Sequence, residues 1–88
     1  MLITDTSEKI NFLKTLLIEL EISIENESEL LNLNFKKLES WSSMKSLLMV
    51  VEIEDKFGVL LTGEEVKNAQ TFADIFETVN RSKNESSN

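Results

Sequence analysis

Two apolar stripes on one predicted helix constrain this chain more than any other feature of its sequence. Residues 41–58 predict a helix that begins at the serine pair Ser42 and Ser43 and ends at Gly58, because glycine just past a helix end accepts a left-handed backbone without a Cβ penalty. At about 100° per residue, its apolar side chains fall into two sectors with charged residues between them. The first stripe holds Met49, Val50, Ile53 and Phe57, and the second stripe holds Met44, Leu47, Leu48 and Val51.

The second stripe leaves two interpretations open, since a surface helix needs only one apolar stripe to face a core. Either the helix is central and buried on both sides, or the first stripe faces the core and the second faces a partner or a ligand. The chain has only 88 residues, and a domain this small has little room for a fully enclosed helix. The size of the chain favours the second interpretation.

Composition argues against most enzyme chemistry. The chain has no cysteine and no histidine. It therefore lacks a thiolate, the commonest general base and the commonest metal ligand. A carboxylate-only metal site stays open, but the spacing of an EF-hand is not present. We expect a protein that is not an enzyme, with no catalytic residue and no metal.

The acidity of the chain has two interpretations: it only keeps the domain soluble, which is the usual case for an acidic domain, or it also attracts a protein partner. The formal net charge is −7 and the pI is about 4.5, which makes nucleic acid and anionic membrane surfaces poor partners and basic protein patches good ones. No apolar run has the length of a membrane span. Residues 1–5 lack the basic start and apolar core of a signal peptide. We expect a cytoplasmic monomer.

The chain before this helix predicts one further helix and a long packed loop. The helix covers residues 6–20, with Asp5 as its cap, Glu8 as a box-like partner of Asp5, and a core stripe of Ile10, Leu13, Leu16, Leu17 and Leu20. The loop covers residues 22–42 and is too apolar for a free linker, so we expect it to lie against the ends of the helices with one short helical turn. Trp41 is predicted to be a packing anchor rather than a ligand-binding residue.

The chain after Gly58 predicts a connector and two more helices. Residues 59–61 are apolar but too few for a strand without a partner. Thr62 and Glu65 form a capping box that opens a short helix over residues 63–68, and Thr71 with Asp74 caps the last helix. We expect a folded domain over residues 1–80 and a disordered polar tail over residues 81–88. The fold class is all-α, and the expected core includes Leu13, Leu17, Met49, Val50, Ile53, Phe57, Phe72 and Phe76.

Residues 41–58 resemble the second helix of the acyl carrier protein family. Members of that family have an Asp-Ser-Leu motif whose serine carries 4′-phosphopantetheine, and a phenylalanine fourteen residues later. Ser43 and Phe57 have this spacing, and the run from Trp41 to Met44 fits the Trp-Asp-Ser-Leu of many free-standing members. Acidic residues and an Ile or Leu of the family pattern are matched by Glu54, Asp55 and Leu61. The resemblance covers roughly residues 5–80.

Two positions depart from the motif. Ser42 replaces the aspartate, which keeps an N-cap acceptor but removes a negative charge that the modifying enzymes read. Met44 replaces the leucine and keeps its volume and apolar character. Lys45 and Leu48 stand where many fatty-acid carriers have acidic residues, which favours a dedicated set of partners over a general fatty-acid synthase.

The resemblance implies a four-helix acyl-carrier-like bundle with a long loop between helices 1 and 2 and a short third helix. It implies an acyl carrier protein with 4′-phosphopantetheine attached to Ser43, which delivers a thioester-bound acyl group to enzymes of fatty-acid, polyketide or other secondary-metabolite synthesis. The implied partners are a phosphopantetheinyl transferase and acyl-loading, acyl-transfer or condensing enzymes with basic docking patches. The implied docking residues are Met44, Leu47, Leu48, Val51, Glu54 and Asp55.

Two alternatives share this fold. One is a peptidyl or aminoacyl carrier with the same arm and a different cargo. The other is a helical interaction module that has no arm, in which Ser43 would be a plain N-cap residue. In none of these cases is Ser43 a self-activated nucleophile, because the chain offers no histidine as a base. In the two carriers it is a substrate that another enzyme modifies. A helix N-terminus suits a phosphodiester, because its free N–H groups and dipole favour an anion.

Overall fold

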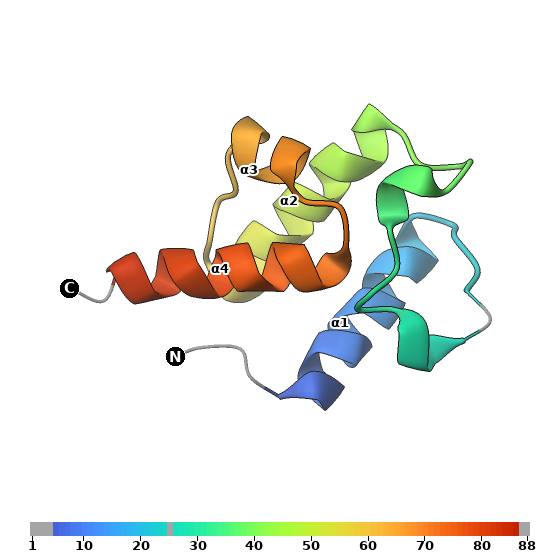
Figure 1. Cartoon of the computed structure of the whole chain (residues 1–88), viewed down its shortest axis with the longest axis horizontal. Coiled ribbons are helices and arrows are strands. Elements are labelled where there is room, and N and C mark those ends of the chain that lie inside the picture. The colour runs from blue at the N-terminus through green and yellow to red at the C-terminus, as the bar shows by residue number, and fades with distance from the viewer. Residues whose placement is uncertain (1–4, 25, 87–88) are drawn as a thin grey trace.

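Four α-helices and a long loop make up the described part of the chain. The computed structural model describes residues 5–24 and 26–86. The helices are α1 (Thr6–Glu19), α2 (Ser43–Phe57), α3 (Gly63–Asn68) and α4 (Phe72–Ser86), and two 3-10 turns, η1 (Glu27–Glu29) and η2 (Phe35–Lys37), lie between α1 and α2 (Figure 1). Within the described ranges there is no β-strand. The predicted all-α class is confirmed.

Side-chain caps set the beginnings of the helices. Asp5 caps α1 by accepting a hydrogen bond from the N–H of Ser7 at 2.8 Å. Thr62 and Glu65 form the predicted capping box of α3, with reciprocal bonds of 2.9 and 3.1 Å. Reciprocal bonds between Thr71 and Asp74 fix the start of α4 in the same way. These caps satisfy amides that no turn of the helix can satisfy, so the predicted boundaries at these positions are confirmed.

Left-handed residues end the first two long helices. Gly58 has φ +73° and its N–H donates to the carbonyl of Glu54, which ends α2 as predicted. At the end of α1 the left-handed residue is Glu21, with φ +60°. Its N–H donates to the carbonyl of Ile18, and the N–H of Ile22 donates to that of Leu17, which is the Schellman pattern of helix ends.

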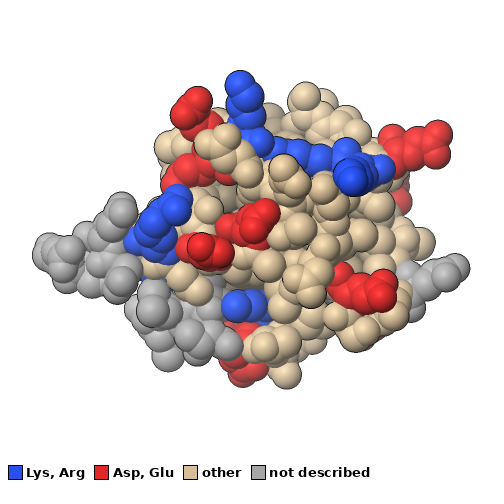
Figure 2. Space-filling view, viewed as in Figure 1, with Lys and Arg blue, Asp and Glu red and all other residues tan. Residues whose placement is uncertain are grey.

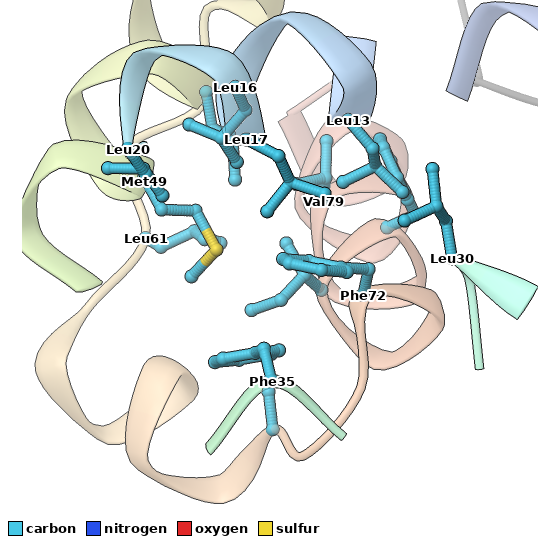
Figure 3. Packing of buried hydrophobic residues seen from close by; sticks show 14 of the residues in the cluster. Leu13, Leu16, Leu17, Leu20, Leu30, Phe35, Met49, Leu61, Phe72 and Val79 are labelled. Atoms are coloured by element: carbon cyan, nitrogen blue, oxygen red, sulfur yellow. The ribbon is translucent and has the colours of Figure 1, made fainter. Parts of the chain in front are cut away.

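The core lies between α1, α2 and α4 and is closed by residues of the loop and the connector (Figure 3). Six of the eight expected core residues are buried, and their first-stripe members on α2 are Met49 and Ile53. Val50 and Phe57 are only partly buried, so the expectation that they belong to the enclosed core is wrong. Both pack against the core from its edge. In the connector, Val59 and Leu61 are buried.

All six aromatic residues of the chain gather in two clusters of three rings, one at each end of α2. The first cluster joins Phe35, Trp41 and Phe72, with ring centroids 4.8 to 6.2 Å apart. The second joins Phe12, Phe57 and Phe76, with centroids 5.0 to 6.1 Å apart. Such distances are typical of favourable aromatic packing. The clusters therefore fix both the beginning and the end of α2 against α4.

The loop between α1 and α2 packs on the helices, as the sequence predicted. Leu30 and Phe35 are fully buried in the core. Asn34 forms an isolated antiparallel bridge with Thr71, the residue that immediately precedes α4 in the chain. The loop contains two 3-10 turns where one helical turn was expected.

The last helix is longer than the sequence predicted. We expected a disordered tail from residue 81, but α4 continues to Ser86, so this boundary is wrong for residues 81–86. Residues 87–88 lie outside the described residues. Extension of an existing helix adds one hydrogen bond per ordered residue without a new nucleation cost, and Arg81 pairs with Glu65 of α3 at 3.7 Å. Among the helices described, none combines the length and apolar composition needed to cross a bilayer.

Candidate functional site

The two serines at the start of α2 have different roles. Ser42 is the N-cap residue, in an extended conformation, and its side chain accepts a hydrogen bond from the N–H of Lys45 at 3.4 Å. Ser43 is the first residue of the helix and is exposed. Within the described part of the chain, the Ser43 hydroxyl has no hydrogen-bond partner. Because Ser42 supplies the cap, the hydroxyl of Ser43 is free for other chemistry.

Trp41 fixes the entry of the chain into α2. Its ring packs on Phe35 at 4.8 Å, and its indole Nε1 donates to Ser46 Oγ at 2.9 Å. Ser46 lies in the first turn of α2. The indole therefore joins the loop to the turn that presents Ser43, and the predicted role of Trp41 as a packing anchor is confirmed.

The second stripe of α2 is exposed along its length. The exposed fractions are 66% for Met44, 59% for Leu47, 43% for Leu48 and 53% for Val51. On the opposite side of the helix, Met49 and Ile53 are 0% and 1% exposed. Of the two interpretations of the stripes, burial on both sides is therefore excluded. Four neighbouring large apolar residues that are all exposed are typical of an interaction surface.

A hollow of about 490 Å³ lies between α2 and α3, beside Ser43. Its apolar lining comes from Leu47 and Val50 on one side and from Leu61 and Val66 on the other. Its remaining lining residues are Lys36, Ser43, Ser46, Thr62, Gly63 and Lys67. The hollow therefore has apolar walls, and the free hydroxyl of Ser43 is part of its lining.

The charges around the site are not uniformly acidic. Glu54 and Asp55 are exposed near the C-terminal end of α2, beyond Val51, which is the last residue of the second stripe. Figure 2 shows basic atoms in a band along the upper edge of one face, between α3 and η2, while acidic atoms are scattered over the same face. Of the two α3 glutamates, Glu64 is exposed, whereas Glu65 is committed to its capping box and to Arg81.

Two carboxyl groups have shifted pKa values. Burial raises the pKa of Glu52 on α2, and the nearby charge of Glu19 and a side-chain hydrogen bond with it add to this, followed by the charge of Asp55. Backbone N–H groups of Gln70 and Thr71 donate to Asp74 and lower its pKa. The pKa of Glu52 is shifted by burial and by neighbouring carboxylates, and that of Asp74 by the amides it caps. Neither residue lines the hollow.

An exposed hydroxyl, an exposed apolar stripe and an apolar hollow meet at the start of α2. Over residues 5–24 and 26–86, no cluster of acidic side chains has the arrangement that could hold a metal ion. The hollow beside Ser43 has no histidine or carboxylate in its lining that could act as a general base, and its ionisable residues are Lys36 and Lys67. The sequence pattern did not predict the hollow, because its walls come from residues that are far apart in the chain and that also read as ordinary packing residues.

Comparisons of the chain with protein-family models, with curated proteins and with solved structures find no match.

Proposed function

We propose that this chain is an acyl carrier protein that receives 4′-phosphopantetheine on Ser43. The observation that carries the proposal is the exposed, unbonded hydroxyl of Ser43 at the first position of α2, next to both an exposed apolar stripe and an apolar hollow. A serine that only began a helix would need neither the exposed apolar stripe nor the hollow beside it. Together they supply an attachment point, a surface for the partner enzymes and space for an apolar cargo.

Ser43 acts as the acceptor of the arm. Its Oγ forms a bond to the phosphorus next to the pantetheine as the pyrophosphate bond of coenzyme A breaks. Adenosine 3′,5′-bisphosphate leaves, and the serine proton passes to a base of the transferase. We assign that base to the partner, since the chain has no histidine and no carboxylate lines the hollow beside Ser43. The amides of Ser43 and Met44 have no acceptor within the described residues, so they are available to the new phosphodiester at the positive end of the α2 dipole. The thiol of the bound arm would hold an acyl group as a thioester.

The second stripe is the proposed docking surface. Met44 follows Ser43 directly, so a transferase that reaches the hydroxyl also covers the start of the stripe. Burial of four exposed apolar side chains supplies affinity at about 25 cal/mol per Å². Glu54 and Asp55 would meet the basic rim of the partner. Lys45 places a positive charge among the docking residues, which favours a partner whose rim is not basic throughout.

The hollow is the proposed shelter for the acyl chain. Its walls are aliphatic, its volume is about 490 Å³, and Ser43 belongs to its lining. An aliphatic chain that enters it leaves water at a gain of about 0.8 kcal/mol for each buried methylene. This supports an acyl cargo over an aminoacyl cargo, whose charged amine would be costly to bury beside apolar walls.

The proposal is tested by the intact mass after reaction with coenzyme A and a broad-specificity phosphopantetheinyl transferase. Wild type and Ser42→Ala should gain the mass of the arm, and Ser43→Ala should not. A gain on Ser43→Ala would place the site at Ser42. If none of the three proteins gains mass, the chain is an unmodified interaction module.

A further inference from the structure

Residues 31–36 of the loop run antiparallel to residues 66–73 and bind them at three points. The carbonyl of Leu31 accepts from the N–H of Ala73 at 2.7 Å. Asn34 forms an antiparallel bridge with Thr71. Lys36 Nζ then donates to the carbonyl oxygens of residues 66 and 67, at 2.7 and 2.6 Å. We call residues 31–36 the strap. It holds the end of α3 and the beginning of α4 with one continuous stretch of chain.

Lys36 is the residue of the strap that contacts α3. The two carbonyls it binds lie in the last turn of α3, where carbonyl groups have no partner within the helix and the dipole favours a cation. A helix of six residues is too short to be stable without outside contacts. Its first turn is held by the capping box of Thr62 and Glu65. Lys36 provides the matching restraint at the other end.

The strap is anchored to α2 independently of Lys36. Phe35 is fully buried, stacks on Phe72 at 4.8 Å, and contacts the ring of Trp41 at the same distance. Trp41 in turn is bonded to Ser46 in the first turn of α2. Loss of the Lys36 ammonium would therefore release the end of α3 while the strap keeps its place on α2 and α4.

Lys36 and Val66 both line the hollow, across from Leu47 and Val50 of α2. The position of α3 against the strap therefore sets the width of the hollow. We propose that Lys36 is a positioning residue that fixes this width and so limits the length of apolar chain that the hollow can shelter. The identity of the occupant as an acyl chain attached through Ser43 rests on the proposed function, whereas the restraint of α3 by Lys36 does not.

The restraint is tested in the unmodified protein by amide hydrogen exchange in wild type, Lys36→Met and Lys37→Met. Methionine keeps most of the apolar stem and removes the donors. Lys37 is the matched control, because it lies in the same 3-10 turn, is exposed, and its side chain makes no polar contact among the described residues. In Lys36→Met, exchange of the amides of Val66 in α3 and of Ala69 at its C-cap should rise about fivefold, the effect of losing one exposed, charged donor group. Lys37→Met should match wild type.

The effect on the hollow is tested without the arm, through a single engineered thiol. The chain has no cysteine, so Ser43→Cys can be alkylated at one position with N-methyl, N-hexyl or N-dodecyl maleimide. The melting temperature of each adduct is measured in three backgrounds: the chain with both lysines, Lys36→Met and Lys37→Met. The hexyl adduct should melt above the methyl adduct in all three. The further rise from hexyl to dodecyl should be larger in Lys36→Met than in the other two.

A general loss of stability in Lys36→Met would lower all three adducts equally and would not change their differences. The proposal is overturned if exchange of α3 is the same in Lys36→Met and wild type, or if the difference between dodecyl and hexyl is the same in all backgrounds. It is also overturned if no alkyl chain raises the melting temperature above that of the methyl adduct. The loading of Ser43 from coenzyme A is measured separately, so failure of the proposed function is distinguishable from failure of this one.

Discussion

Individual residues at helix ends carry much of the information in this chain. Ser42 and Ser43 are chemically identical neighbours, yet one caps α2 and the other is free. The difference comes from the backbone, because only the N-cap residue has the extended conformation that turns its side chain toward the amides of the first turn. The spacing of fourteen residues to Phe57 selected Ser43 in the sequence, and Ser42 is the one that caps the helix.

Glu21 is a residue in a strained conformation, and replacing it should stabilise the protein. Its φ of +60° is unfavourable for a side chain with a Cβ atom. Glu21→Gly should raise the free energy of unfolding by about 0.5–1 kcal/mol, measured by thermal or urea denaturation. Glu21→Ala removes the same charge but keeps the Cβ atom, so it should bring no comparable gain. Equal gains in both variants would assign the effect to charge.

Glu52 should make stability depend on pH. Because its pKa is raised in the folded state, the ionised form is disfavoured there, and the contribution of Glu52 to stability is present at low pH and lost as pH rises through its folded pKa. Glu52→Gln should therefore raise the melting temperature at neutral pH and have no effect below about pH 4, where the carboxyl is protonated in both states. Asp74 acts in the opposite direction, since its lowered pKa gives stability that is lost as pH falls. A melting-temperature gain in Glu52→Gln that is the same at both pH values would rule out titration as its cause.

At the scale of elements, α2 is defined by its two unlike stripes. The sequence predicted both stripes, the beginning and end of α2, and the caps of α3 and α4, because these features depend on residues close together in the chain. It did not predict the hollow or the contact of Lys36 with α3, because any exposed lysine has the same local sequence signal and its acceptors lie 30 and 31 residues away. The extension of α4 to Ser86 was missed because residues 81–86 are polar and have no apolar stripe of their own.

The two stripes should respond differently to a substitution that introduces a charge. Val51→Glu, in the exposed second stripe, should change the free energy of unfolding by no more than about 0.5 kcal/mol. Ile53→Glu, in the buried first stripe, should cost about 4 kcal/mol or more, because it places an unpaired charge in the core. Urea denaturation measures both. In the folded Val51→Glu variant, the kcat/KM of the transferase should fall about tenfold. Unfolding of Val51→Glu would show that its stripe is needed by the fold.

At the scale of the whole molecule, the two aromatic clusters hold α2 at both ends while its middle presents the second stripe. Phe57 belongs to the cluster with Phe12 and Phe76, but it is only partly buried. Phe57→Ala should therefore cost about 2–4 kcal/mol, less than the about 3–5 kcal/mol expected for the fully buried Phe76→Ala. Chemical denaturation of both variants gives the comparison. A larger cost for Phe57→Ala than for Phe76→Ala would mean that Phe57 stabilises the fold by more than its burial explains.

The central claim is the attachment of an arm to one particular serine, and mass mapping of a tryptic peptide tests it most directly. After reaction with coenzyme A and a broad-specificity transferase, cleavage at Lys37 and Lys45 releases residues 38–45, which contain Ser40, Ser42 and Ser43. Fragmentation of this peptide assigns the modification to one of the three. The account predicts the phosphopantetheine mass on Ser43 alone. The same mass on Ser40 or Ser42, or an unmodified peptide, would contradict it.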